Sequence, residues 1–168
     1  MRSIQVFCFC FCFGLAPLAI SSPARAEVQV VFTAPESYVD AGLLCRDGER
    51  AREVTLRTIR EQLVGLGERY LAPGQTLEIE VLDVNLAGEL EWWHGTEYIR
   101  YLRGSTWPTI KLRYTFKDSG GQTARSAEET VSDPSYQMNI IAATRSGDVM
   151  PYEKEMLARW FRSRFAAG

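Results

Sequence analysis

The feature that most constrains this chain is an alternation of apolar and polar side chains over residues 76–86. One face of this segment carries Leu77, Ile79, Val81 and, in the same register, Asp83. The other face carries Glu78, Glu80 and Leu82. Successive side chains of a strand point to opposite faces of a sheet, so the pattern predicts a β-strand with one buried and one solvated face. Such a strand is typical of an antiparallel sheet.

Three other segments, residues 27–33, 109–116 and 122–131, also have the composition of strands. The last two are joined by Asp118-Ser119-Gly120-Gly121, which is a strong turn signal. Residues 98–102 could form a further short strand. Residues 136–143 fit a strand and a helix equally well, and this alternative stays open.

Two segments have the period of an amphipathic helix. Apolar residues follow one another at spacings of three and four over residues 49–70, and Pro73-Gly74 ends this helix. Pro151 opens a second helix, where its missing amide costs nothing. The sequence therefore predicts an α+β fold: a mainly antiparallel sheet of four to five strands with two helices packed on one face, forming a single domain over residues 27–168.

Residues 1–26 resemble a signal peptide. Arg2 precedes an almost wholly apolar run from Ile4 to Ile20, and Ala24-Arg25-Ala26 fits a cleavage site. We expect cleavage near Ala26, a periplasmic or secreted location, and no stable membrane span afterwards. Two alternatives remain open: an uncleaved anchor, for which the apolar run is short, and a lipoprotein, for which the leader cysteines lie too far inside that run.

Cleavage changes the charge and the cysteine content. The chain has 19 basic and 21 acidic residues, and loss of Arg2 and Arg25 leaves 17 basic residues against 21 acidic ones, a net charge of −4. This balance argues against a nucleic-acid partner. Only Cys45 remains of the four cysteines, so no internal disulfide can form. Cys45 is expected to be buried, with a reactive thiol as the alternative. No cofactor or metal is expected.

Few residues point to catalysis. His94 is the only histidine, so a small hydrolase or lyase would have to combine it with Asp83 and Asp133. The segment Asp83–Gly88 resembles a calcium loop, but Ala87 stands at its third ligand position and His94 where the bidentate glutamate belongs. A binding function is the favoured hypothesis, with the enzyme as its alternative.

The aromatic segment 92–107 is the best candidate for a binding surface. Flat apolar rings with polar edges suit a glycan or another envelope protein. The alternative is that some of these rings cap a small core. The candidate binding residues are Trp92, Trp93, His94, Tyr98, Arg100 and Trp107.

Several motifs together resemble an uncharacterised bacterial exported family, domain of unknown function 3016. In chain order, they are Pro73–Ile79, Asp83–Glu89, Trp107–Tyr114, Ser132-Asp133 with Tyr136, Tyr152-Glu153-Lys154 and Trp160-Phe161. The resemblance implies an exported protein and supplies no activity. It also picks out four polar residues within apolar runs: Asp83, Arg113, Asp133 and Glu153. We expect these to form a buried network in which Arg113 pairs with Asp83 or Asp133, and a functional cluster is the alternative.

Overall fold

A computed structural model describes residues 25–42, 48–90, 100–144 and 147–166. Its main sheet has the strand order β1-β2-β5-β6. These strands are β1 (Glu27–Phe32), β2 (Thr76–Asn85), β5 (Thr109–Lys117) and β6 (Thr123–Ser132). The pairs β2–β5 and β5–β6 are antiparallel, whereas β1 and β2 are parallel. A second sheet consists of β3 (Glu89–Leu90) and β4 (Arg100–Tyr101).

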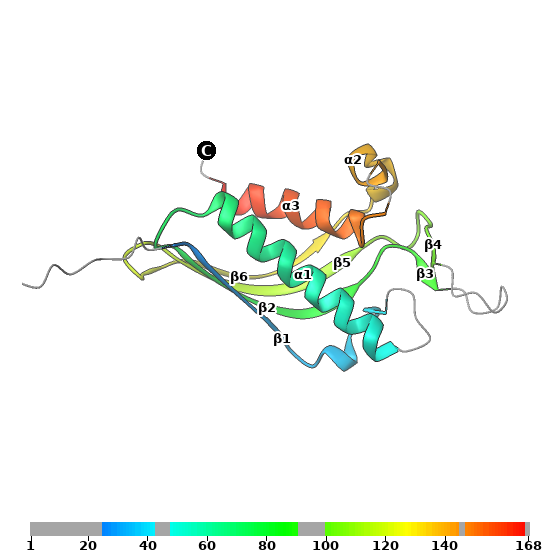
Figure 1. The fold of residues 1–168 in the computed structure, drawn as a ribbon, viewed down its shortest axis with the longest axis horizontal. Helices are drawn as coiled ribbons and strands as arrows, with labels where there is room; N and C mark the ends of the chain where they lie inside the picture. Colours follow the sequence, from blue (N-terminus) through cyan, green and yellow to red (C-terminus); the bar gives the residue numbers. More distant parts are fainter. Residues whose placement is uncertain (1–24, 43–47, 91–99, 145–146, 167–168) are drawn as a thin grey trace, which may run out of the picture.

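Two long helices, α1 (Gly48–Tyr70) and α3 (Pro151–Phe165), lie on the same face of the main sheet (Figure 1). Helix α1 connects the parallel strands β1 and β2, because a parallel pair needs a long crossover. Ile59 and Leu63 of α1 pack with Phe161 of α3 in a core that also takes the inward side chains of β2 and β5. The predicted α+β fold, with two helices on one face of a mainly antiparallel sheet, is confirmed.

The opposite face of the sheet is solvated and carries rows of paired charges. Arg113 of β5 lies between Glu80 of β2 and Glu128 of β6, at 2.7 and 2.8 Å. Lys117 pairs with Glu78 at 2.6 Å. These cross-strand pairs agree with the sequence pattern, which placed the glutamates of β2 on a wet face.

A β-bulge interrupts β2 and changes the direction of one predicted core position. The register passes from Val81 opposite Leu112 to Asp83 opposite Lys111, so Leu82 is the extra residue. Asp83 therefore shares the open face with Lys111, and Val84 takes the buried position. The prediction that Asp83 continues the face of Leu77 was wrong, because alternation cannot continue through a bulge.

The remaining elements are short. They are a 3-10 turn at Pro35–Ser37, a second at Tyr136–Met138, and α2 (Ile140–Ala143). The ambiguous segment 136–143 is thus helical, and the possible strand at 98–102 is represented by β4. Figure 1 shows β3, β4, α2 and the first turns of α1 and α3 gathered at one end of the sheet. In the described part of the chain, no helix combines the length and apolarity that a membrane crossing requires.

Candidate functional site

A largely buried ion pair between Arg100 and Asp40 organises this end of the sheet. Arg100 belongs to β4 and its side chain is 9% exposed, whereas that of Asp40 is 25% exposed. Arg100 Nη2 lies 2.7 Å from Asp40 Oδ2. The backbone of Asp40 is itself fixed, because its N–H donates to Val84 and its carbonyl accepts from Leu86 just beyond β2. The pair therefore joins β4 to the end of the main sheet.

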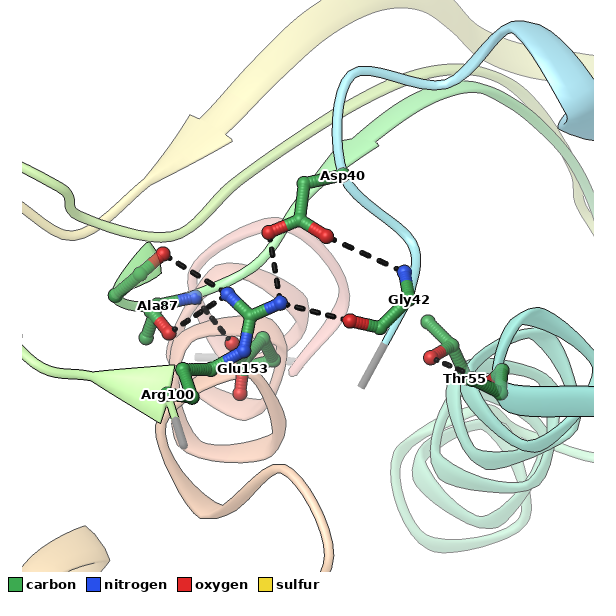
Figure 2. Close-up of polar contacts among 8 residues, drawn as sticks. Asp40, Gly42, Thr55, Ala87, Arg100 and Glu153 are labelled. Atoms are coloured by element: carbon green, nitrogen blue, oxygen red, sulfur yellow. Dashed lines mark hydrogen bonds and ion pairs between the residues drawn. The ribbon is translucent and has the colours of Figure 1, made fainter. Parts of the chain in front are cut away.

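The Arg100 guanidinium also ties two backbone segments together. Nη2 donates to the carbonyl of Gly42 at 2.8 Å, and Nη1 donates to the carbonyls of Ala87 and Gly88 at 3.3 and 2.9 Å (Figure 2). The Nη nitrogens thus make four hydrogen bonds, matching their four N–H groups. The remaining donor, Nε–H, is buried and has no hydrogen-bond partner among the described residues.

The turn at Gly88 requires glycine. Its φ is +77°, and a Cβ at this position would lie 2.5 Å from the carbonyl oxygen of Tyr101. The Gly88 N–H donates to the carbonyl of Thr106 at 2.9 Å. The backbone of the turn can therefore approach β4 closely enough for Arg100 to reach both turn carbonyls.

Glu153 lies on the other side of the same turn. It belongs to the first turn of α3, is only 3% exposed, and its Oε1 accepts the Ala87 N–H at 2.7 Å. Burial raises the pKa of Glu153 above its ordinary value, and the Ala87 N–H and the Arg100 charge oppose this shift only in part. Ala87 thus connects to Arg100 through its carbonyl and to Glu153 through its amide.

Two hollows adjoin this cluster. The first, called here the apolar cavity, has a volume of about 610 Å³ and is lined mostly by apolar residues of α1, the turn at residues 86–87, Leu102 and residues 149–152. Arg100 and Glu153 also line it. The second, called here the Trp107 hollow, has a volume of about 560 Å³. It is lined largely by polar groups, among them Asp40, Asn85, Glu89, Thr106 and Thr109. Arg100 thus lines one hollow and its partner Asp40 the other.

A family model described as "Protein of unknown function (DUF3016)" matches residues 26–163. The chain belongs to this family. The resemblance inferred from the sequence motifs is thereby confirmed. A comparison with curated proteins gave no match.

Among solved structures, the chain is similar to the PelC dodecamer from Paraburkholderia phytofirmans. The sequence identity is 14%, the TM-score is 0.36, and the match covers 91% of this chain and 96% of that chain. A leucine-to-methionine variant of the same dodecamer matches at 14% identity and a TM-score of 0.37, covering 84% of this chain and 85% of that chain.

Of the six predicted binding residues, the structure describes two, Arg100 and Trp107, and these lie in different surroundings. Trp92, Trp93, His94 and Tyr98 lie outside the described residues, as does Cys45. Trp107 is 39% exposed and lines the hollow named after it. Arg100 was expected at the polar edge of an aromatic surface. Its side chain is instead largely enclosed, because Asp40 and three backbone carbonyls surround its guanidinium.

The predicted buried network of Asp83, Arg113, Asp133 and Glu153 is not formed as expected. Arg113 is exposed and pairs with Glu80 and Glu128 instead. Asp83 accepts the N–H groups of Val39 and Val84, both at 2.9 Å. The other two residues are buried, but apart from Arg113, since Asp133 pairs with Arg159 of α3 and Glu153 binds Ala87.

Sequence reasoning missed Asp40, Glu89 and the backbone of residues 87–88. Glu89 is exposed and lines the Trp107 hollow. No local pattern marks Asp40, because its partner Arg100 is 60 positions away in the sequence. Within the described ranges, no group of three or more histidine, cysteine or acidic side chains has the geometry of a metal site.

Proposed function

We propose that this chain is a non-enzymatic binding module of the bacterial envelope and that it binds an uncharged saccharide in the Trp107 hollow. The observation that carries the proposal is a large aromatic ring, 39% exposed, in a hollow lined mainly by polar side chains. An aromatic face packs against the C–H groups of a sugar ring, while amide, hydroxyl and carboxylate groups bind its hydroxyls.

The lining of the hollow indicates the charge of the ligand. Asp40 and Glu89 are acidic, and no basic residue belongs to the described lining. Asn85 and Thr109, which face each other across β2 and β5, add uncharged polar groups. Arg100 balances the charge of Asp40, but the exposed carboxylate of Glu89 would repel an anionic saccharide, so a neutral one is favoured.

The envelope location is supported by the leader-like composition of residues 1–26, with its apolar run and its Ala24-Arg25-Ala26 site. Cleavage near Ala26 would leave β1 intact, since this strand begins at Glu27. Export would bring the domain to a compartment where envelope glycans and envelope proteins are available as partners.

A hydrolase or lyase that uses Asp83, His94 and Asp133 has less support. Asp83 binds two backbone N–H groups, and Asp133 pairs with Arg159 and accepts the Ser135 N–H. Neither carboxylate lines the apolar cavity or the Trp107 hollow. Both therefore have structural partners that account for their positions.

The test is a binding measurement with the purified chain. Calorimetric titration with a neutral N-acetylglucosamine trisaccharide and with an anionic galacturonate trisaccharide compares the two charge classes. We expect binding of the neutral sugar, at least about tenfold weaker binding of the anionic one, and a similar loss for Trp107→Ala.

The matched control is Met138→Ala. Met138 is also an exposed apolar residue, at 82%, but it does not line the Trp107 hollow. This variant should bind as the wild-type chain does. Failure of the neutral trisaccharide to bind at millimolar concentration, or wild-type affinity in Trp107→Ala, would contradict the proposal.

A further inference from the structure

We propose that the outer edge of β6 is a dimerisation surface, on which β6 of a second copy of this chain pairs antiparallel about a two-fold axis at Ala127. The two main sheets of four strands would then join into one sheet of eight. Neither the family description nor the proposed saccharide site assigns a partner to this edge.

Strand β6 has a neighbouring strand on one side only, because it lies at the edge of the main sheet. A bulge at Ala124 precedes its regular part, and Asp133-Pro134 follows its end. Between these two points, most residues of β6 are exposed. Among the described residues, no strand pairs with its outer side. A long, exposed edge strand of this kind is a template for pairing with another strand.

The pairing with β5 shows which backbone groups of β6 point outward. The Asp133 N–H donates to the carbonyl of Pro108, so these two opposite residues form a hydrogen-bonded pair. Hydrogen-bonded and non-hydrogen-bonded pairs alternate along antiparallel strands. Every second residue back from Asp133 therefore bonds to β5, whereas Ser126, Glu128 and Thr130 direct their N–H and C=O groups to the outer edge. A second strand would supply hydrogen-bond partners for these groups.

Arg125 carries a charge that a second copy can balance. It is exposed, its Nη1 donates to the carbonyl of Arg164 at 2.7 Å, and it has no acidic partner among the described residues. Glu129 lies four residues further along β6, on the same face. Its carboxylate binds Arg164 and Trp160, and its side chain is still 22% exposed. A carboxylate has enough acceptor sites to bind a second arginine as well.

The charges of β6 select one register. A two-fold axis perpendicular to the sheet keeps the helices of both copies on the same side, so opposite residues must belong to the same face. With the axis at Ala127, Arg125 lies opposite Glu129 of the second copy, and this pair occurs twice. An axis at Ser126 would place Arg125 opposite alanine. An axis at Glu128 would place two glutamates opposite each other, which is destabilising.

Helix α3 leaves room for this arrangement. Trp160 of α3 contacts Tyr114 of β5 and Glu129 of β6, so the helix lies over both strands. A helix centred between two strands about 4.8 Å apart would lie about 10 Å from its symmetry mate across the new β6 pair, a usual separation of packed helices. Arg159 and Arg164 of α3 already pair with acidic residues of their own chain, so the two helices can approach without unbalanced charge.

The test combines the mass in solution with disulfide crosslinking. Sedimentation velocity of the purified chain should give a dimer. Ala127→Cys places two thiols directly opposite each other at the axis, within the Cα separation of about 4.4–6.8 Å that a disulfide spans, and should crosslink under mild oxidation. Ser126→Cys is the matched control. In this register the two copies of residue 126 are diagonal neighbours about 7–8 Å apart, too far for a disulfide.

Both cysteine variants carry Cys45→Ser, and Cys45→Ser alone controls for the other cysteines of the chain. A chain that stays monomeric at millimolar concentration would leave the edge to another partner and overturn the proposal. A dimer that Ala127→Cys does not crosslink would have its interface elsewhere and would also overturn it. Crosslinking of Ser126→Cys in place of Ala127→Cys would refute the assigned register.

A charge reversal tests the electrostatic part of the proposal. Arg125→Glu places like charges opposite each other and should weaken the dimer at least about tenfold. Arg57→Glu makes the same change on an exposed residue of α1 and should leave the affinity unchanged. Circular dichroism checks that both variants are folded. Equal dimer affinities for the folded Arg125→Glu and Arg57→Glu variants would overturn the register.

The dimer and the saccharide site can fail separately. Arg125 does not line the Trp107 hollow, so the monomeric Arg125→Glu chain should bind the neutral trisaccharide as the wild-type chain does. Trp107→Ala should dimerise normally. Loss of saccharide binding therefore leaves the proposed dimer standing, and absence of the dimer leaves the proposed function standing.

Discussion

Replacement of Arg100 by methionine should be the most informative perturbation of this fold. The substitution keeps much of the apolar stem but removes one ion pair and three hydrogen bonds to backbone carbonyls. Removing one partner of a buried pair typically costs about 3–5 kcal/mol. Asp40 is 25% exposed and can be partly rehydrated, so we expect the lower end, about 3 kcal/mol. Typical domains have only about 5–15 kcal/mol of total stability.

The assay is urea denaturation followed by tryptophan fluorescence and far-ultraviolet circular dichroism. Arg100→Met should lower the midpoint without changing the slope, because the folded state keeps its size. Arg113→Met is the matched control. Arg113 also binds acidic side chains, but it lies on the open face of the sheet, where an ion pair adds little to stability.

Two results would refute this reasoning. A loss below about 1 kcal/mol for Arg100→Met would mean that water already solvates the guanidinium and that the pair behaves like a surface pair. Equal losses for Arg100→Met and Arg113→Met would mean that burial does not distinguish the two arginines. A loss for Arg100→Met alone would establish that the pair holds this end of the sheet together.

Three further substitutions probe the core, the turn and the buried acid. Phe161→Ala removes a ring that is fully buried among aromatic neighbours and should cost about 3–5 kcal/mol in urea denaturation. Gly88→Ala forces a Cβ against the Tyr101 carbonyl at a positive φ and should lower the thermal midpoint, with a cost of about 1–3 kcal/mol. Burial raises the pKa of Glu153, so the native state keeps a proton that the unfolded state releases near pH 4.5. The contribution of Glu153 to stability therefore falls as the pH rises from about 4.5 through the native pKa. The free energy of unfolding of Glu153→Gln, measured against pH, should therefore rise relative to that of the wild-type chain across this pH range. A difference in free energy that does not change with pH would contradict the raised pKa.

The local patterns of the sequence predicted most of the secondary structure. The helix expected at 49–70 is observed at Gly48–Tyr70, and the strand expected at 109–116 is observed at Thr109–Lys117. These elements were predictable because the apolar residues of a helix recur every 3.6 positions and those of a half-buried strand every 2, so both patterns can be recognised within a short stretch of sequence. Leu82 shows where this reasoning fails, since a bulge depends on the pairing with β5 and leaves no mark in the alternation.

The candidate site was much less predictable. Trp107 was selected for its aromatic ring, and its partial exposure agrees with that choice. Arg100 was selected as the polar edge of an aromatic surface, which was the wrong reason. Its actual partner, Asp40, lies 60 positions away in the sequence, and no local pattern indicates that the two side chains meet. Asp133 and Glu153 look like members of one network in the sequence, yet each binds a different part of the fold. Tertiary placement, rather than residue type, decides which of these charges meet.

The position of the Arg100–Asp40 pair supports a role in shaping the two hollows. A buried ion pair is rarely more stabilising than well-packed apolar residues of the same size, so stability alone does not account for it. An apolar side chain in place of Arg100 could fill the space, but it could not fix the carbonyls of Gly42, Ala87 and Gly88 at defined distances from β4. Ala87 lines the apolar cavity, on one side of the pair, and Gly88 lines the Trp107 hollow, on the other. The directed hydrogen bonds of one arginine therefore hold one lining residue of each hollow in place, as a preformed binding site requires.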